Sequence, residues 1–216
     1  MMDRRKALKN MGLAMGYTIA TPTLISIMQS CKGETVATWT PEFLTPAEGG
    51  VLTKLVDVIL PKTETPSASE VQVDIFIDKF ANDVMKKEEQ DFFRMAMGKF
   101  TDKALMDSGK SDVEDLTVED LEPVLAAALK NTKEDEAEMF ESITSYTEAV
   151  AEGKEATLDD GTSRFAFANN LRGLTIWGYK TSEYVGEEVL AYLPVPGEYI
   201  ACADTQELTE GKAWSL

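Results

Sequence analysis

Two arginines and a cysteine near the N-terminus are the residues whose types and spacing indicate a definite chemistry. Arg4 and Arg5 stand in a short basic segment, and Cys31 ends the mildly apolar stretch that follows it. A basic segment before a short apolar one is a secretory signal, and a twin arginine is typical of the Tat route, which carries folded proteins. Residues 28–30, Met-Gln-Ser, are similar to a lipobox, which precedes a cysteine that becomes lipidated. We therefore predict a Tat-type lipoprotein signal peptide over residues 1–30, with the Tat translocase as a partner.

The leader also has a plainer interpretation, in which Arg4 and Arg5 belong to an ordinary Sec signal and Cys31 is incidental. Ala7 stands where Phe is commonest in Tat leaders. The apolar residues 11–27 are diluted by Gly, Thr, Ser and Pro, whereas a membrane span needs about 20 predominantly apolar residues. We expect an exported protein of the bacterial periplasm or cell envelope, held at the membrane by a lipid on Cys31.

The acidic composition argues against two classes of partner. The chain has 21 Lys and Arg and 38 Asp and Glu; residues 1–30 hold four of the basic residues and one acidic residue. The remaining 186 residues therefore carry 17 basic against 37 acidic residues, a net charge of −20. Such a charge disfavours nucleic acid and anionic membrane surfaces as partners. A segment of this length is enough for one domain with a sizeable core.

The chain has no histidine. Histidine is the commonest general base and the commonest neutral metal ligand, so its absence excludes Ser-His-Asp and Cys-His catalysis and disfavours ordinary zinc or haem sites. The two cysteines form no CxxC pair. If Cys31 is lipidated, Cys202 has no partner within the chain; otherwise a disulfide between the two stays possible. We predict no catalytic residue, no metal site and no cofactor bound by this chain.

The elements that must carry these residues are predicted to be helices. Residues 45–48, Thr-Pro-Ala-Glu, form a capping box with proline at the first helical position, and an apolar stripe runs from there to Pro61. Further stripes at helical spacing cover residues 73–84, 93–104, 117–129, 133–150, 164–179 and 181–193. We expect an all-α fold, an irregular bundle of about six or seven helices.

The domain organisation follows from these elements. Residues 31–44 are predicted to be an irregular tether, and residues 45–216 a single helical domain with an irregular C-terminal tail. Residues 152–163 are predicted to be a loop. The helix over residues 164–179 is apolar around much of its circumference, so we expect it to be buried on more than one side, in the core or beneath a partner.

Four segments resemble those of a known family. Residues 171–183, LRGLTIWGYKTSE, followed by residues 190–197, LAYLPVPG, are similar to the C-terminal signature of the gluconate 2-dehydrogenase subunit 3 family. Residues 43–46, FLTP, and 59–68, ILPKTETPSA, are similar to that family's opening segment and to its Thr-Asp-Thr-Pro-Gly-Ala loop. Residues 85–160 match only as helical filler. The C-terminal signature is the specific part of the resemblance.

The resemblance implies an accessory role. Members of this family are small subunits of membrane-associated, flavin-dependent sugar and polyol dehydrogenases, whose catalytic partner is a larger FAD-containing subunit of the glucose–methanol–choline type. FAD is then expected in the partner subunit. That subunit often lacks an export signal, so the small subunit supplies the Tat leader for both, and a cytochrome c subunit is a further candidate partner. The alternative is a free-standing exported helical lipoprotein that acts as a binding or scaffold module.

The candidate partner-interface residues belong to the C-terminal signature and the residues around it. They are Leu174, Trp177, Gly178, Tyr179, Tyr184, Tyr192, Pro194 and Pro196. Large aromatics often anchor binding, but the same residues are equally compatible with a core. Gly173 and Gly178 allow a close backbone approach, either by a partner or within the chain. The turn over residues 194–197 is a docking arm or a simple helix end, and the acidic stretches are a solvated face or a guide for a basic cytochrome.

Overall fold

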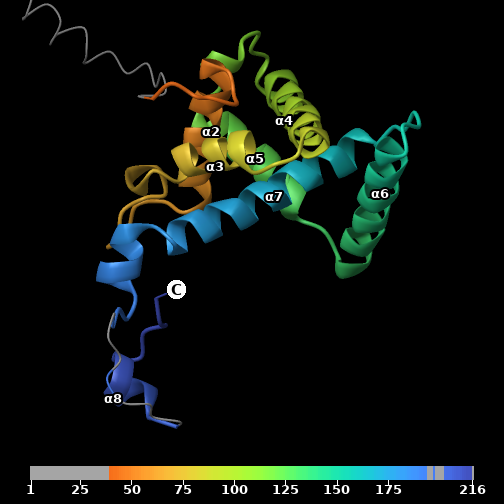
Figure 1. Cartoon of the computed structure of the whole chain (residues 1–216). Helices are drawn as coiled ribbons and strands as arrows, with labels where there is room; N and C mark the ends of the chain where they lie inside the picture. The colour runs from red at the N-terminus through yellow and green to blue at the C-terminus, as the bar shows by residue number, and fades with distance from the viewer. Residues whose placement is uncertain (1–38, 194–196, 198–201, 216) are drawn as a thin grey trace, which may run out of the picture. The chain divides into compact units, whose positions relative to one another are not determined.

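The computed structural model describes residues 39–193, 197 and 202–215 (Figure 1). The predicted leader, with Arg4, Arg5 and Cys31, lies outside the described residues, as do Pro194 and Pro196. The predictions made for these residues therefore stay predictions.

Helices account for the regular structure of the described residues, and no strand forms there. The six longer helices are α2 (Pro46–Ile59), α3 (Val73–Asp83), α4 (Lys87–Ser108), α5 (Val118–Leu129), α6 (Lys133–Ala151) and α7 (Asp160–Lys180). Shorter turns are η1 (Ser69–Val71), η2 (Val113–Asp115), η3 (Val185–Val189) and α8 (Thr205–Thr209). The all-α prediction is confirmed. None of the helices among the described residues combines the length and apolar character that crossing a membrane requires.

The helix starts follow local sequence signals. At α2, the Thr45 side chain accepts from the Glu48 N–H while the Glu48 carboxylate accepts from the Thr45 N–H at 2.8 Å, which is the predicted capping box. At α7, the Asp159 carboxylate accepts from the Thr162 N–H at 2.9 Å. This cap starts α7 at Asp160, so the predicted loop over residues 152–163 is shorter than expected.

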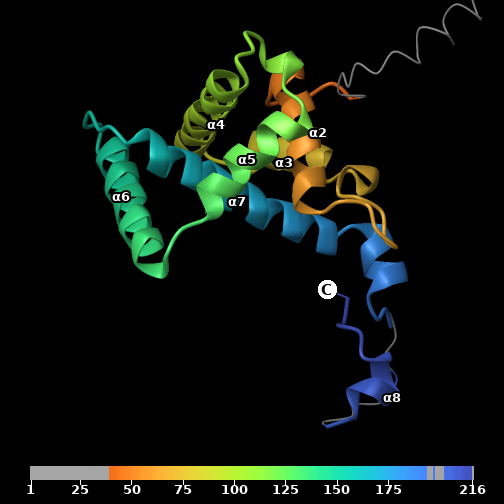
Figure 2. The same cartoon turned by 180° about the vertical axis from the view of Figure 1, so that it is seen from behind.

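Helix α7 is the centre of the packing. It contacts α2, α3, α4, α5 and α6, and the two views show it running past α2 to α5, with α6 beside its N-terminal end (Figures 1 and 2). Phe165, Phe167 and Leu171 on α7 are almost completely buried. The expectation that this helix is buried on more than one side is confirmed.

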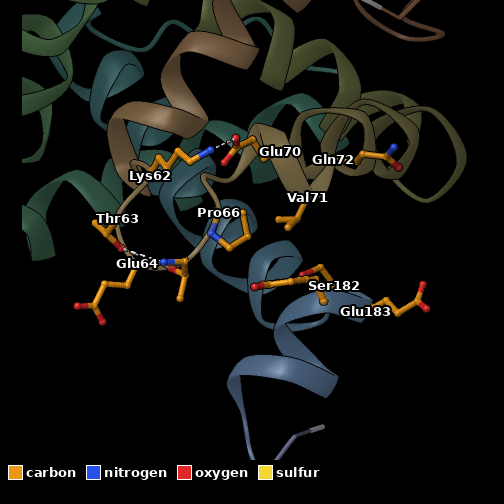
Figure 3. Close-up of a pocket in the computed structure, with 11 residues that line it drawn as sticks. Lys62, Thr63, Glu64, Pro66, Glu70, Val71, Gln72, Ser182 and Glu183 are labelled. Atoms are coloured by element: carbon orange, nitrogen blue, oxygen red, sulfur yellow. Dashed lines mark hydrogen bonds and ion pairs between the residues drawn. The ribbon is translucent and has the colours of Figure 1, made fainter.

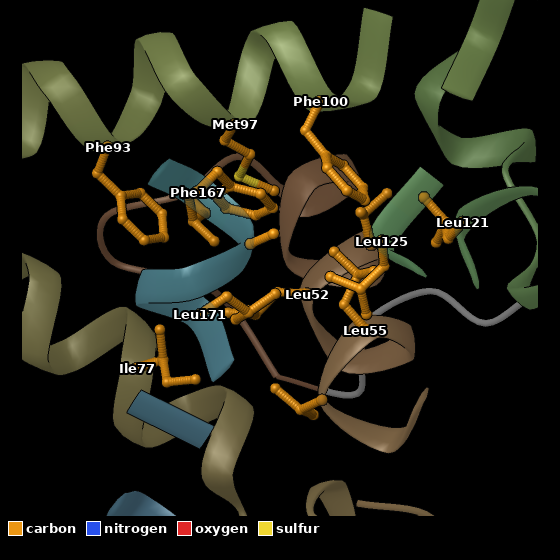
Figure 4. Close-up of a cluster of buried hydrophobic side chains, with 14 of the residues drawn as sticks. Leu52, Leu55, Ile77, Phe93, Met97, Phe100, Leu121, Leu125, Phe167 and Leu171 are labelled. Atoms are coloured by element: carbon orange, nitrogen blue, oxygen red, sulfur yellow. The ribbon is translucent and has the colours of Figure 1, made fainter. Parts of the chain in front are cut away.

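The main core lies between α2, α3, α4, α5 and α7 (Figure 4). Phe167 of α7 packs against Phe93 and Phe100 of α4, with ring centroids 5.5 and 5.1 Å apart. Figure 4 shows these rings above Leu52 and Leu55 of α2 and Leu171 of α7. Such interdigitation of large side chains fixes the position of α7 relative to the rest of the bundle.

Two aspartates of α3 hold the segment before α2 against the body. The fully buried Asp78 carboxylate accepts from the backbone N–H groups of Glu42 at 2.7 Å, Phe43 at 3.3 Å and Leu44 at 2.9 Å. Asp74, one turn earlier, accepts from the Trp39 indole N–H at 3.2 Å. Phe43 and Leu44 are themselves buried. We call residues 39–44 the strap; it is the last part of the predicted tether, and it is packed into the body.

The predicted last helix is much shorter than its apolar spacing indicated. A π-turn, η3, ends at Val189, where the Leu190 N–H donates to the Val185 carbonyl. Ala191 then pairs with the C-terminal tail: its N–H donates to the Ala213 carbonyl, and its carbonyl accepts from the Ser215 N–H, both at 2.9 Å. Because the tail uses these backbone groups, the chain cannot continue as a helix, and Tyr192 lies beyond the turn.

Candidate partner interface

The C-terminal half of α7 divides its residues between the body and solvent. Leu171, Thr175 and Gly178 recur every three to four residues and are buried, whereas Ile176 and Trp177 are almost half exposed, at 44% and 45%. This half of the helix therefore presents apolar surface outward as well as inward. Such surface is typical of a binding site when several apolar side chains adjoin one another.

Three aromatic side chains form a cluster where α3 lies against α7. The Trp177 ring meets the rings of Phe76 and Phe80 edge to face, with centroids 5.1 and 5.4 Å apart. Phe76 and Phe80 are half-buried, and their own centroids are 6.0 Å apart. We call Phe76, Phe80 and Trp177 the aromatic patch. Since each ring is held by the other two, the patch is a rigid surface that loses little conformational freedom on binding.

The α7 charges next to the patch are basic, in contrast to the acidic composition of the chain. Arg172, Ile176 and Lys180 recur every four residues and form an exposed stripe on α7 beside Trp177. Neither Arg172 nor Lys180 forms an ion pair with a carboxylate among the described residues. An apolar centre with a charged rim is the usual anatomy of a protein interface.

Gly178 is explained by packing within the chain. A Cβ atom at this position would lie 2.6 Å from Cδ1 of Phe76 and 3.3 Å from Cγ1 of Val73, so only glycine lets α3 approach α7 this closely. Gly178 is buried and offers no surface to a partner. At Gly173 a Cβ atom would meet nothing within 4 Å, and the position is exposed.

Tyr179 is part of the body rather than of the exposed surface. Its ring is partly buried against the core, and its hydroxyl bonds to Thr65 Oγ1 at 3.0 Å and donates to the Pro66 carbonyl at 2.8 Å. Leu174, also predicted for the interface, is likewise partly buried against the core. Tyr179 and Leu174 therefore hold α7 against the body and so position its exposed residues, Ile176 and Trp177.

Tyr184 lies on an open groove. Its side chain is 47% exposed, and the groove, of about 670 Å³, runs between the loop over residues 62–72 and the turn after α7 (Figure 3). Lys62 Nζ lies 2.5 Å from Glu70 Oε1 in this loop, and this contact together with the Ser67 N–H lowers the pKa of Glu70. The pair fixes one wall of the groove.

Tyr192 belongs to a further exposed apolar region at the C-terminus. It is 50% exposed, next to the exposed Leu193, and Trp214 in the tail is exposed as well. Seven of the twelve exposed large hydrophobic residues of the described chain follow residue 175. The apolar surface is thus concentrated in the C-terminal fifth of the chain. Cys202, in the same region, is exposed, and its predicted alternatives depend on Cys31, outside the described residues.

The comparison with protein families places the chain in one of them. Residues 46–197 match the family described as gluconate 2-dehydrogenase subunit 3, and the chain therefore belongs to this family. The family is named for one subunit of a multi-subunit dehydrogenase. The resemblance found in the sequence is confirmed. No curated protein and no solved structure was found to match the chain.

The sequence did not assign two of the three patch residues, Phe76 and Phe80, to the partner interface. Phe76 and Phe80 were assigned to the apolar face of the second helix, and nothing local shows that they meet Trp177. The signal that pointed toward them is Gly178, because a glycine inside a helix costs about 1 kcal/mol relative to alanine and so suggests a close neighbour, which Gly178 has and Gly173 lacks. In the structure that neighbour is the Phe76 ring.

Proposed function

We propose that this chain is the non-catalytic small subunit of a FAD-dependent sugar or alcohol dehydrogenase, and that it binds the catalytic flavoprotein subunit through the aromatic patch. The observation that carries the proposal is the half-exposed Trp177, held edge to face by Phe76 and Phe80, all three within the residues that match the family. Tryptophan in a preorganised aromatic setting is the commonest type of binding hot spot. In this proposal the partner subunit binds FAD and supplies the catalytic base, since this chain has no histidine that could act as the base.

We propose in addition that the small subunit exports its partner. In this proposal Arg4 and Arg5 direct the folded pair to the Tat translocase, and a lipid on Cys31 anchors it at the cell envelope. A chain with no histidine and no cofactor motif has little need of folded export for itself. A signal for folded export fits a partner that must carry its flavin across the membrane already bound.

Co-purification tests the binding. The chain is co-expressed with a glucose–methanol–choline-type flavoprotein encoded beside it, and recovery of the flavin absorbance with the tagged small subunit is measured. We expect Trp177→Ala to lower the affinity at least about 30-fold, the effect of losing about 2 kcal/mol at a hot spot. The control is Met106→Ala on α4, which removes a side chain that is 80% exposed and should change nothing. If the wild-type chain recovers no flavoprotein, the free-standing lipoprotein is the better description.

Two further measurements test the export. Replacing Arg4 and Arg5 by lysine should leave both subunits in the cytoplasm. A catalytic subunit that still reaches the envelope contradicts co-export. Mass spectrometry of the mature N-terminus should find a diacylglyceryl group on Cys31, and an unmodified Cys31 removes the anchor from the proposal.

A further inference from the structure

Two of the segments that resemble the family, far apart in the sequence, meet at one place in the structure. The loop over residues 59–68 and the signature over residues 171–183 are joined by the Tyr179 hydroxyl, which bonds to Thr65 and Pro66. The groove described above is lined by residues of both segments and by those that directly follow them (Figure 3). Features of the sequence that mark the family thus build one concave surface, separate from the aromatic patch.

The lining of the groove is mixed, with several hydroxyl groups beside its apolar surface. The loop contributes Thr63, Thr65 and the Lys62–Glu70 pair, and the turn after α7 contributes Ser182 and Tyr184. Pro66 and Val71 supply the apolar part. A flavin site is usually a concave, mostly apolar pocket that buries most of its ligand, whereas this groove is more open than enclosed. The shape suits a segment of another chain lying across the surface.

The charge of the groove is negative. Glu64 and Glu183 lie at opposite sides of the lining residues in Figure 3, and both are exposed. Neither forms an ion pair among the described residues, while the single lysine of the lining is already engaged by Glu70. Their side chains point away from each other in Figure 3, so these two carboxylates complement Lys or Arg side chains at opposite ends of the groove.

The groove adjoins the surface already proposed for the partner. Gln72 lines it at the N-terminal end of α3, one helical turn before Phe76, and Ser182 lines it just after α7, which carries Trp177. Gln72 is one of two non-glycine residues of the described chain with positive φ, at 62°. A strained backbone at the rim of a concave surface is a common mark of a functional site.

We propose that this groove binds an extended segment of the catalytic flavoprotein subunit, and that basic side chains of that segment pair with Glu64 at one end of the groove and with Glu183 at the other. The inference rests on the proposed function and adds a second, electrostatic contact to the apolar one at Trp177. The aromatic patch supplies buried apolar area, and the groove selects the partner by charge.

Charge reversal tests this contact. Glu64→Lys and Glu183→Lys should each weaken binding of the co-expressed flavoprotein at least tenfold in 50 mM salt, and the difference from wild type should shrink in 500 mM salt. The control is Glu141→Lys on α6, an exposed glutamate whose reversal changes the net charge equally. Glu183→Gln, which keeps the shape, should give a smaller loss. Circular dichroism and the melting temperature of each variant exclude unfolding as the cause.

A photo-crosslink identifies the occupant. Benzoylphenylalanine in place of Tyr184 should crosslink to a flavoprotein peptide that contains Lys or Arg. A crosslink to this chain's own residues, or none, overturns the groove proposal, as does unchanged binding by both reversals. If the wild-type chain binds no flavoprotein at all, the proposed function itself fails, which is a different outcome from wild-type binding with indifferent groove variants.

Discussion

The hydroxyl of Tyr179 donates a 2.8 Å hydrogen bond to the backbone carbonyl of Pro66, 113 residues earlier in the chain. The bond ties the end of α7 to the loop that forms the groove. Tyr179→Phe removes only this hydroxyl and leaves the ring in place. We expect the free energy of unfolding to fall by about 1 kcal/mol, the usual net value of such a bond, as measured by urea denaturation. Tyr184→Phe, at an exposed ring, should lie within about 0.5 kcal/mol of wild type.

The two glycines of α7 should respond oppositely to alanine. Gly178→Ala places a Cβ atom 2.6 Å from the Phe76 ring, so α3 must move, and we expect a loss of about 1–3 kcal/mol in stability. Gly173→Ala meets open space, and should raise stability by as much as about 1 kcal/mol because alanine favours the helix. Thermal unfolding of both variants measures the difference. Equal effects at the two positions would mean that α3 and α7 are farther apart than described.

Asp78 should be among the most sensitive polar positions. Asp78→Ala leaves the backbone N–H groups of Glu42, Phe43 and Leu44 without their acceptor. We expect a loss of about 3 kcal/mol in stability, with faster hydrogen exchange confined to the strap. The matched control is Asp83→Ala, which removes an exposed carboxylate at the end of the same helix. Equal losses for the two variants would contradict the role given to the strap.

The ion pair between Lys110 and Asp120 makes the free energy of unfolding depend on pH in the acidic range. Lys110 Nζ lies 2.6 Å from Asp120 Oδ2, and this contact, helped by the Thr117 N–H, lowers the pKa of Asp120 to about 2. Because the folded pKa lies below the unfolded value of about 4, the carboxylate contributes its full stabilisation above pH 4 and loses it as the pH falls toward 2.

Removing the lysine should therefore raise the pKa of Asp120. With Lys110→Gln we expect the carboxyl carbon of Asp120 to titrate closer to pH 4 in an NMR titration, and acid unfolding to begin at a higher pH. Lys87→Gln, which breaks the exposed pair with Asp91 on α4, is the control and should leave the pH at which acid unfolding begins unchanged. An unshifted Asp120 titration in the Lys110 variant would assign the low pKa to Thr117 alone.

Local signals predicted the helices well, because each helix start has its own chemistry. The capping box of Thr45 and Glu48 is such a case, and the apolar circumference around Phe167 correctly indicated a central helix. Pairings between distant segments have no such local signal. The contact of Trp177 with Phe76 depends on how α3 and α7 pack, and the shortening of the last helix depends on the tail that bonds to Ala191.

Buried charge is the other feature that the sequence conceals. An aspartate within an apolar helix, such as Asp78, has the pattern of a surface residue. It is buried because three N–H groups of the strap converge on it and replace its hydration. Since the strap has no periodicity of its own, nothing local indicated that residues 39–44 belong to the body.

If Cys31 carries the lipid that we propose, the strap sets the length of free chain between this protein and the membrane. Cys31 and Trp39 are eight residues apart, and eight extended residues span at most about 28 Å. A force transmitted from the bilayer through this lipid would act on the hydrogen bonds that join the strap to Asp74 and Asp78 on α3. That helix also carries Phe76 and Phe80. A flavoprotein bound at the aromatic patch would therefore be held close to the lipid surface, within reach of electron acceptors that reside in the membrane.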